Sequence, residues 1–146
     1  MISRSRVEGG FTLVELAVVV VIIGVLAAFA VPRFLSSVER SKAAEAFNYL
    51  STVAAAQERY HARQGTYGAD LTKLDIKFSP LQYFETTGIN EADAETMQTT
   101  WSMTLTRKGA SAGYGAYTVN FNEDGYDGNN STIASYPDIN PMQTAD

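Results

Sequence analysis

The chain has 146 residues, a formal net charge of −5 and a hydrophobic share of 45%, which is ordinary for a globular protein. It contains no cysteine, which excludes disulfide bridges, thiol catalysis and zinc–thiolate sites, and its single histidine, His61, excludes most histidine-based metal and triad chemistry. The acidic balance disfavours a general nucleic-acid-binding protein, so we expect no direct nucleic-acid partner.

An apolar segment near the N-terminus dominates the sequence. No side chain between Leu16 and Pro32 is charged, and at about 1.5 Å per helical residue this stretch would nearly cross a hydrocarbon layer about 30 Å thick. Two arginines precede this segment, so the positive-inside tendency predicts a cytoplasmic N-terminal tail and a head on the other side of the membrane. Glu15 is the exception within the segment. A charged acid inside a membrane costs about 2.5–3.5 kcal/mol and usually has a partner.

Three interpretations of this segment are open. The first is a signal peptide cleaved after Ala30, which would release a secreted soluble binding domain. The second is a permanent single-span anchor. The third interpretation is a prepilin-type segment, whose helix is kept after processing and later packs among copies of itself. Glu15 favours the third, because a signal peptide has no use for the acid and a simple anchor would be better without it.

The stretch GGFTLVE and the apolar run that follows it resemble the N-terminal signature of type IV pilins and their pseudopilin relatives. The resemblance implies a cytoplasmic leader peptide, residues 1–10, that a prepilin peptidase cleaves after Gly10. It also implies N-methylation of Phe11, which becomes the new terminus, and a role in subunit assembly for Glu15. We hypothesise that the Glu15 carboxylate pairs with the Phe11 amine of a neighbouring subunit, because pairing makes a buried charge less costly.

The resemblance further implies a function and a location. The chain would be a structural subunit with a single span in the inner membrane and its C-terminal head outside the cytoplasm. The assembly machinery would polymerise it into a homo-oligomeric, extracellular helical filament for adhesion, motility or DNA uptake. The alternative within the family is a pseudopilin of a type II secretion system, in a periplasmic pseudopilus. No nucleophile elbow, phosphate-binding loop or catalytic triad is present in the sequence, so we predict that the chain is not an enzyme.

One long helix is expected to begin as the transmembrane or filament-core segment 11–34 and to continue as an amphipathic spine over 35–64. Gly24 weakens this helix and Pro32 is expected to kink it. The apolar face of the spine is predicted at Phe34, Val38, Leu50, Val53 and Tyr60, with Phe47 and Ala54 beside it. The charged residues are assigned to the opposite, solvated face: Glu39, Arg40, Lys42, Glu45, Glu58, Arg59 and Arg63. Gln64-Gly65 supplies a helix stop.

Residues 65–146 are predicted to form a small α+β head in which an antiparallel sheet lies against the spine. A loop with a short helical turn follows Gly65, anchored by Leu71, Leu74 and Ile76. Alternating patterns predict strands over 81–89, 101–107 and 113–121, and the glycine-rich residues 108–113 suit a hairpin loop. The pair Arg107-Lys108 is a candidate basic patch.

The tail from Asn122 onward is predicted to be loop, because it combines Asp-Gly steps, asparagines and prolines. Its oxygen-bearing side chains are candidate calcium ligands: Asp124, Asp127, Asn129, Asn130 and Asp138. Turns made by the same side chains are the competing and favoured interpretation, so no cofactor is predicted. Pilins often carry a C-terminal disulfide that this chain lacks, so packing, hydrogen bonds or an ion must fix its tail.

Overall fold

The computed structural model describes residues 10–77, 79–90, 93, 95–109 and 113–143. The chain divides into two compact units, one ending at Phe34 and the other beginning at Leu35. Residues 1–9 of the predicted leader, and residues 110–112 in the centre of the predicted hairpin loop, lie outside the described residues.

A single helix, α1 (Leu13–Gln64), supplies the described secondary structure of the first unit and the spine of the second. It includes Gly24 and Pro32 without a break in helical structure. The kink expected at these residues stays a prediction. The helix ends as expected at Gln64, because Gly65 adopts a φ of +74° and its N–H donates to the carbonyl of His61 at 2.8 Å.

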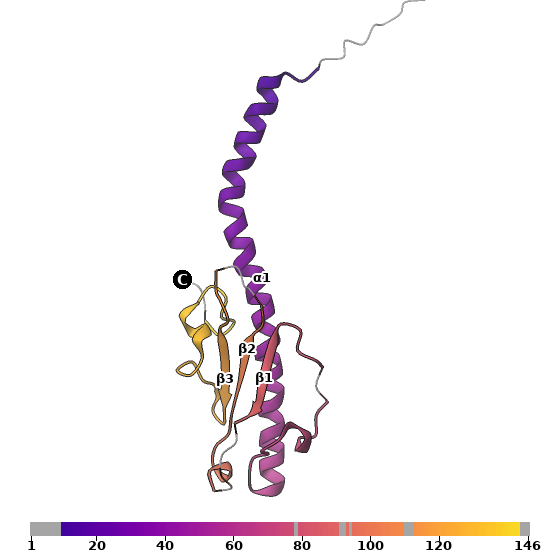
Figure 1. Cartoon of the computed structure of the whole chain (residues 1–146), viewed down its shortest axis with the longest axis vertical. Coiled ribbons are helices and arrows are strands. Elements are labelled where there is room, and N and C mark those ends of the chain that lie inside the picture. Colours follow the sequence, from indigo (N-terminus) through magenta and orange to yellow (C-terminus); the bar gives the residue numbers. More distant parts are fainter. Residues whose placement is uncertain (1–9, 78, 91–92, 94, 110–112, 144–146) are drawn as a thin grey trace, which may run out of the picture. The chain divides into compact units, whose positions relative to one another are not determined.

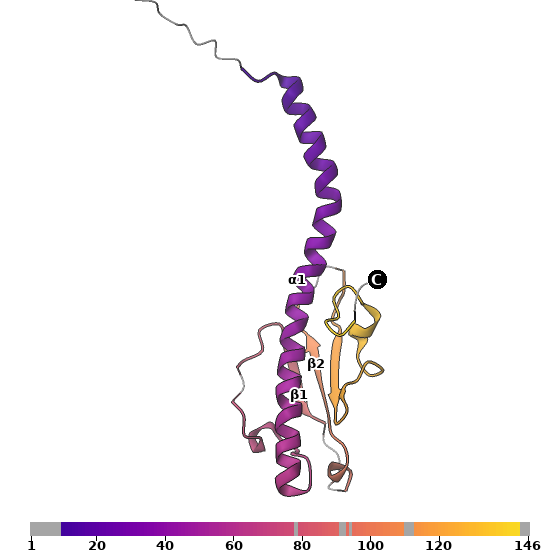
Figure 2. The ribbon, with the colours of Figure 1, turned by 180° about the vertical axis from the view of Figure 1, so that it is seen from behind.

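The head contains a four-stranded antiparallel sheet in the order β1-β2-β3-β4. Its strands are β1 (Phe84–Ile89), β2 (Ser102–Arg107), β3 (Thr118–Asn122) and the short β4 (Gly125–Tyr126). Figures 1 and 2, seen from opposite sides, show the sheet lying over the C-terminal half of α1. The predicted α+β fold of a long helix and a small antiparallel sheet is therefore confirmed.

The core of the head forms where one face of the sheet meets α1. Met103 pairs with Phe121 and Leu105 with Val119 across β2 and β3, and all four side chains are buried. The buried residues of α1 are Glu39, Ala43, Ala46, Phe47, Leu50, Val53, Ala56 and Gln57. Burial of this apolar face against the sheet is the main stabilising contribution to the head.

The predictions for Glu39 and for the tail were wrong. Glu39 does not lie on the solvated face of the helix: it is 3% exposed and shares the buried face with Ala43 and Phe47. The tail is not all loop, because β4 pairs with the end of β3 and a 3₁₀ helix spans Thr132–Ser135. The two-residue strand and the single 3₁₀ turn are too short to produce a periodic pattern.

The predictions for the loop after α1 and for the positions of the main strands are largely confirmed. A 3₁₀ helix spans Leu71–Lys73 in the loop after α1, capped by Asp70, whose side chain accepts from the Thr72 N–H at 2.7 Å. Leu74 is buried, and Leu71 and Ile76 pack against the core. The predicted strand regions 81–89 and 101–107 contain β1 and β2, and β3 begins within the third region, 113–121, but extends one residue beyond it to Asn122.

Candidate functional site

The first turn of α1 is closed by a capping box between Thr12 and Glu15. The Glu15 carboxylate accepts hydrogen bonds from the Thr12 N–H and the Thr12 hydroxyl, both at 2.8 Å. In return the Glu15 N–H donates to the Thr12 hydroxyl oxygen at 3.2 Å. This exchange satisfies amides that a helix N-terminus otherwise leaves without partners. Glu15 is therefore held in a defined position in the first turn of α1, a few residues after Gly10 and Phe11.

The described residues of the first unit from Leu13 to Val31 are almost all apolar and exposed. Phe11 is 78% exposed and Val21 66% exposed, and the other large apolar side chains as far as Phe34 are exposed as well. Within the described residues, this is the one helix long and apolar enough to span a membrane. Contiguous apolar surface on this scale marks a membrane-binding or protein-binding segment.

A buried ion pair joins the spine to the sheet in the second unit. The Arg107 guanidinium donates to both oxygens of the Glu39 carboxylate, at 2.6 Å from Nε and 3.3 Å from Nη2. The Tyr117 hydroxyl donates to the same carboxylate at 2.9 Å. Lys42 approaches it to 3.5 Å from the partly exposed side. These contacts fix β2 and β3 to one position along α1.

The surroundings of this pair shift the pKa of its members. Burial raises the pKa of Glu39, but the hydrogen bonds from Arg107 and Tyr117 and the nearby positive charges outweigh it, so the pKa is lowered. Burial and the bond to the carboxylate together raise the pKa of the Tyr117 phenol. Glu39 is thus held ionised and Tyr117 protonated. The basic patch predicted at Arg107-Lys108 was wrong, because Arg107 is buried in this pair and the Lys108 ammonium donates to the Leu81 carbonyl at 2.9 Å.

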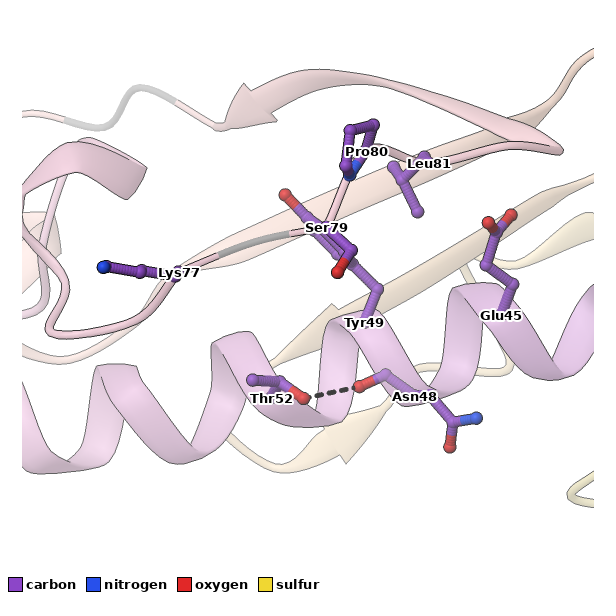
Figure 3. A pocket seen from close by; sticks show the side chains of 8 residues that line it. All are labelled: Glu45, Asn48, Tyr49, Thr52, Lys77, Ser79, Pro80 and Leu81. Carbon is purple, nitrogen blue, oxygen red and sulfur yellow. Dashed lines mark hydrogen bonds between the residues drawn. The ribbon is translucent and has the colours of Figure 1, made fainter.

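A second acid of the spine holds the segment that leads into β1. The two oxygens of Glu45 accept from the backbone N–H groups of Gln82, at 2.7 Å, and Tyr83, at 2.9 Å. Beside these bonds lies an open pocket of about 350 Å³ between α1 and residues 77 and 79–81. Figure 3 shows Glu45 and Leu81 at one end of it and Lys77 at the other. Because both oxygens of the Glu45 carboxylate already accept backbone hydrogen bonds, we assign Glu45 a structural role.

The candidate calcium ligands of the tail take part in local contacts. Asp127 accepts from the N–H groups of Asn129 and Asn130, at 3.0 and 3.2 Å, and from the side-chain amide of Asn130 at 2.6 Å. The Tyr114 hydroxyl donates to Asp138. In the part of the chain that the structure describes, no three His, Cys, Asp or Glu residues gather as a metal site would require. The contacts of Asp127 are those expected of a turn stabilised by its own side chains. Calcium binding stays an untested alternative.

Packing and hydrogen bonds hold the tail to the rest of the head. Ile133 and Ile139 are fully buried in the core. The buried Asn140 donates from its side chain to the Tyr126 hydroxyl at 3.1 Å. Arg40 of the spine donates to the carbonyl of Gln143 at 3.2 Å. The residues of the tail that the structure describes are thereby fixed without a disulfide.

Comparison with known proteins gives one family model and several relatives, each of which matches part of the chain. Residues 5–31 match the family model described as a prokaryotic N-terminal methylation motif. The fimbrial protein EcpC of Eikenella corrodens is 42% identical over 66 residues, which is 45% of this chain and 43% of that protein. The type IV major pilin protein PilA of Myxococcus xanthus is 42% identical over 71 residues, 49% of this chain and 31% of the relative.

A third relative is named for secretion rather than for a pilus. The type II secretion system core protein G of Pseudomonas aeruginosa is 44% identical over 57 residues, 39% of this chain and 40% of that protein. The chain thus spans less than half the length of each of these relatives. No solved structure matches the chain.

Proposed function

We propose that this chain, which belongs to the type IV pilin and pseudopilin family, is a structural subunit held in the inner membrane and polymerised into a helical surface filament. The observation that carries the proposal is the N-terminal unit itself. It combines the methylation motif over residues 5–31, an uncovered apolar helix and a single acid fixed at the first turn. The chain would cross the membrane once, with the head outside the cytoplasm, and would act as a building element rather than an enzyme.

The capping box supports a specific course of assembly. Prepilin peptidase would cleave after Gly10 and leave Phe11 as the new, N-methylated terminus. Thr12 and Glu15 both remain in the mature chain, so the cap survives the cleavage. A carboxylate oxygen has lone pairs enough to accept a further bond. The Glu15 carboxylate would then accept the Phe11 amine of the next subunit, and the pairing of two otherwise costly charges would set the axial position of each new copy.

Replacement of Glu15 tests the proposal. Glu15→Val should leave membrane insertion intact, because the segment becomes more apolar, and should abolish filaments, as seen by electron microscopy of the cell surface. Glu15→Gln is the matched control for the cap. It keeps an acceptor for Thr12 but removes the charge, and it should also lose filaments if the amine needs a carboxylate. Normal filaments from Glu15→Val would contradict the proposal.

The N-terminus of the mature protein tests the processing step. Sequencing and mass measurement of the membrane-held protein should give Phe11, carrying a methyl group. A mature protein beginning at Val31 would instead indicate a secreted soluble domain released by a signal peptidase and would overturn the proposal.

The second candidate function is a pseudopilin of a type II secretion system, favoured by the similarity to core protein G of such a system. Deletion of the chain separates the two. Loss of surface filaments with normal secretion supports the pilus subunit, whereas retained periplasmic proteins with unchanged surface filaments support the pseudopilin.

A further inference from the structure

The sheet face that points away from α1 carries polar side chains at paired positions of β2 and β3. Ser102 lies opposite Asn122, and Thr104 lies opposite Asn120, while the alternate residues Met103 and Phe121 face the core. Two facing strands with hydroxyl and amide side chains at neighbouring pairs provide a continuous row of hydrogen-bonding groups. The sheet therefore presents a polar floor on the side that the spine does not use.

The segment after β4 turns this floor into a hollow. The Asp127 N–H donates to the Asn120 carbonyl at 3.0 Å, and the Asn120 N–H donates to the Ser131 hydroxyl at 2.8 Å. Residues 127–131 therefore run along the edge of β3 next to β4. The resulting cavity has a volume of about 450 Å³. Its lining includes Ser102, Thr104, Asn120, Asn122, Asp127 and Asn130. The size is within the range of small-molecule sites, and Asn120 is 5% exposed although it lies on the outer face.

Hydrogen bonds within the hollow orient its side-chain amides and leave some of their donors and acceptors available. The side-chain amide of Asn120 donates to the Thr104 hydroxyl at 2.7 Å, and that of Asn90 donates to the Ser102 hydroxyl at 2.7 Å. Among the described residues, the amide oxygens of Asn90 and Asn120 accept no hydrogen bond. Each threonine or serine hydroxyl that accepts in this way can still donate its own proton. The hollow thus offers donors and acceptors side by side, held by the sheet.

The charges around the hollow restrict what can bind there. Its lining contains no lysine, arginine or histidine, so a phosphate or another anion would find no counter-charge. Asp127 is the one carboxylate of the lining, and its oxygens already accept three bonds from Asn129 and Asn130. A divalent cation prefers several oxygen ligands, more than one of them usually charged. A neutral ligand rich in hydroxyl groups matches the array best, because each hydroxyl both donates and accepts.

Trp101 is among the residues that line the same hollow, and its fluorescence can be used to follow binding there. Its side chain is 2% exposed, and its indole N–H is the one buried side-chain polar atom in the described part of the chain that has no hydrogen-bond partner. A buried donor without a partner calls for an explanation such as an ordered water. Trp101 is also the only tryptophan in the sequence, and it belongs to the same core cluster as Met103 and Leu105, so the intrinsic tryptophan fluorescence of the protein comes from the core side of the sheet, next to the floor of this hollow.

We propose that this polar hollow is a binding site for a neutral carbohydrate. Its asparagine and hydroxyl side chains would bind the sugar hydroxyls, and Asp127 would accept from one of them. The site is separate from the apolar N-terminal segment, so its failure would leave the proposed filament role untouched and the failure of that role would leave the site untouched.

The test is a titration of the detergent-solubilised full chain with neutral saccharides, followed by Trp101 fluorescence. Glucose, galactose, mannose, N-acetylglucosamine and N-acetylgalactosamine serve as probes, with inorganic phosphate and calcium chloride as charged comparisons. Thr104→Val removes the hydroxyl that Asn120 bonds while nearly keeping the shape of the side chain. Thr106→Val is the matched control, because it changes the same outer face of β2 two residues farther from the hollow. Circular dichroism establishes that both variants fold, and Ser102→Ala replaces Thr104→Val if that variant does not.

A saturable fluorescence change with at least one saccharide is expected for the unchanged chain and for Thr106→Val. The apparent affinity should fall about tenfold or more in Thr104→Val, as expected for the loss of about 1.4 kcal/mol of binding free energy. The proposal is overturned by the absence of a response to every saccharide, by an equal response in Thr104→Val, or by a saturable response to phosphate or calcium alone.

Discussion

The two halves of α1 differ in burial although they belong to one helix. The N-terminal half is almost wholly apolar, yet Val21 is 66% exposed and no part of the described chain covers its neighbours. The C-terminal half is mixed in composition, yet Leu50 is completely buried beneath the sheet. Apolarity alone therefore does not determine burial within a chain. What matters is whether a covering surface is supplied, and the described chain supplies one for the second half and none for the first.

The acids of the two halves differ in the same way. Glu15 is exposed and bonded to Thr12, three residues away. Glu39 is buried and bonded to Arg107, which is 68 residues away in the sequence. One acid serves the local helix end, and the other depends on the complete head. The comparison predicts that changes in the second half disturb the fold, whereas changes in the first half disturb assembly.

The largest effect is expected from Arg107→Leu, which leaves the Glu39 carboxylate buried without its main partner. Removal of one member of a buried pair costs about 3–5 kcal/mol, and the free energy of unfolding of the head should fall by that amount. Chemical denaturation of the full chain in detergent, followed by Trp101 fluorescence, measures it. The double variant with Glu39→Leu should recover most of the loss. A cost below about 1 kcal/mol for the single variant would show that the pair does not hold the head together.

Leu50→Ala and Val21→Ala compare the two halves directly. Leu50→Ala removes a fully buried side chain and should lower the free energy of unfolding of the head by about 2–5 kcal/mol. Val21→Ala removes an exposed side chain of the first unit and should leave that free energy within about 0.5 kcal/mol of the unchanged protein. Equal effects in the same denaturation experiment would abolish the distinction between the halves.

Glu39→Gln isolates the charge of the buried acid. Hydrogen bonds to a charged group contribute about 1.5–3 kcal/mol, so the variant should be less stable by about that amount at pH 7. Because the pKa of Glu39 is lowered below its ordinary value of 4.5 when folded, its contribution is complete above that pH and is lost as the pH falls through the folded value. The stability difference between the two proteins should therefore shrink in unfolding experiments below pH 4.5. A difference that stays constant down to about pH 2 would contradict the assignment of Glu39 as the titrating group.

The smallest effect is expected at the end of the spine, where Asp75 pairs with Arg59 at 2.9 Å and with Arg63 at 3.1 Å. All three side chains are well exposed, so solvent and salt screen the pairs. Asp75→Asn should lower the free energy of unfolding only slightly, and the difference should vanish in about 0.5 M salt. A larger, salt-independent loss would mean that Asp75 does more than pair with these two arginines.

Much of the fold could be predicted because the periodic patterns of this sequence agree with the elements they indicate. The alternation of Trp101, Met103 and Leu105 identifies β2, and Gly65 marks the end of α1. Leu50 and Val53 are buried, as their helical spacing predicts. Local patterns suffice where the partner of a residue lies on a regular element whose faces differ in polarity.

The buried pair was missed because charged side chains usually lie in solvent. Glu39 precedes Ala43 by four residues and Phe47 by eight, so helical spacing already puts it on the buried face. Arg107 likewise continues the alternation of Leu105 on β2. Two opposite charges, each in phase with an apolar face, were the signal. The polar hollow had no comparable signal, because it depends on how residues 127–131 fold along the edge of β3.

The way in which the tail is held has a consequence for where this head can work. Ile133, Ile139 and Asn140 fix it by packing and hydrogen bonding, and the sequence contains no thiol that could be oxidised to a disulfide. The maturation of the head therefore needs no oxidant, thiol oxidase or isomerase, and a reductant has no bond in it to break. The redox state of the surroundings should therefore not decide whether the head folds.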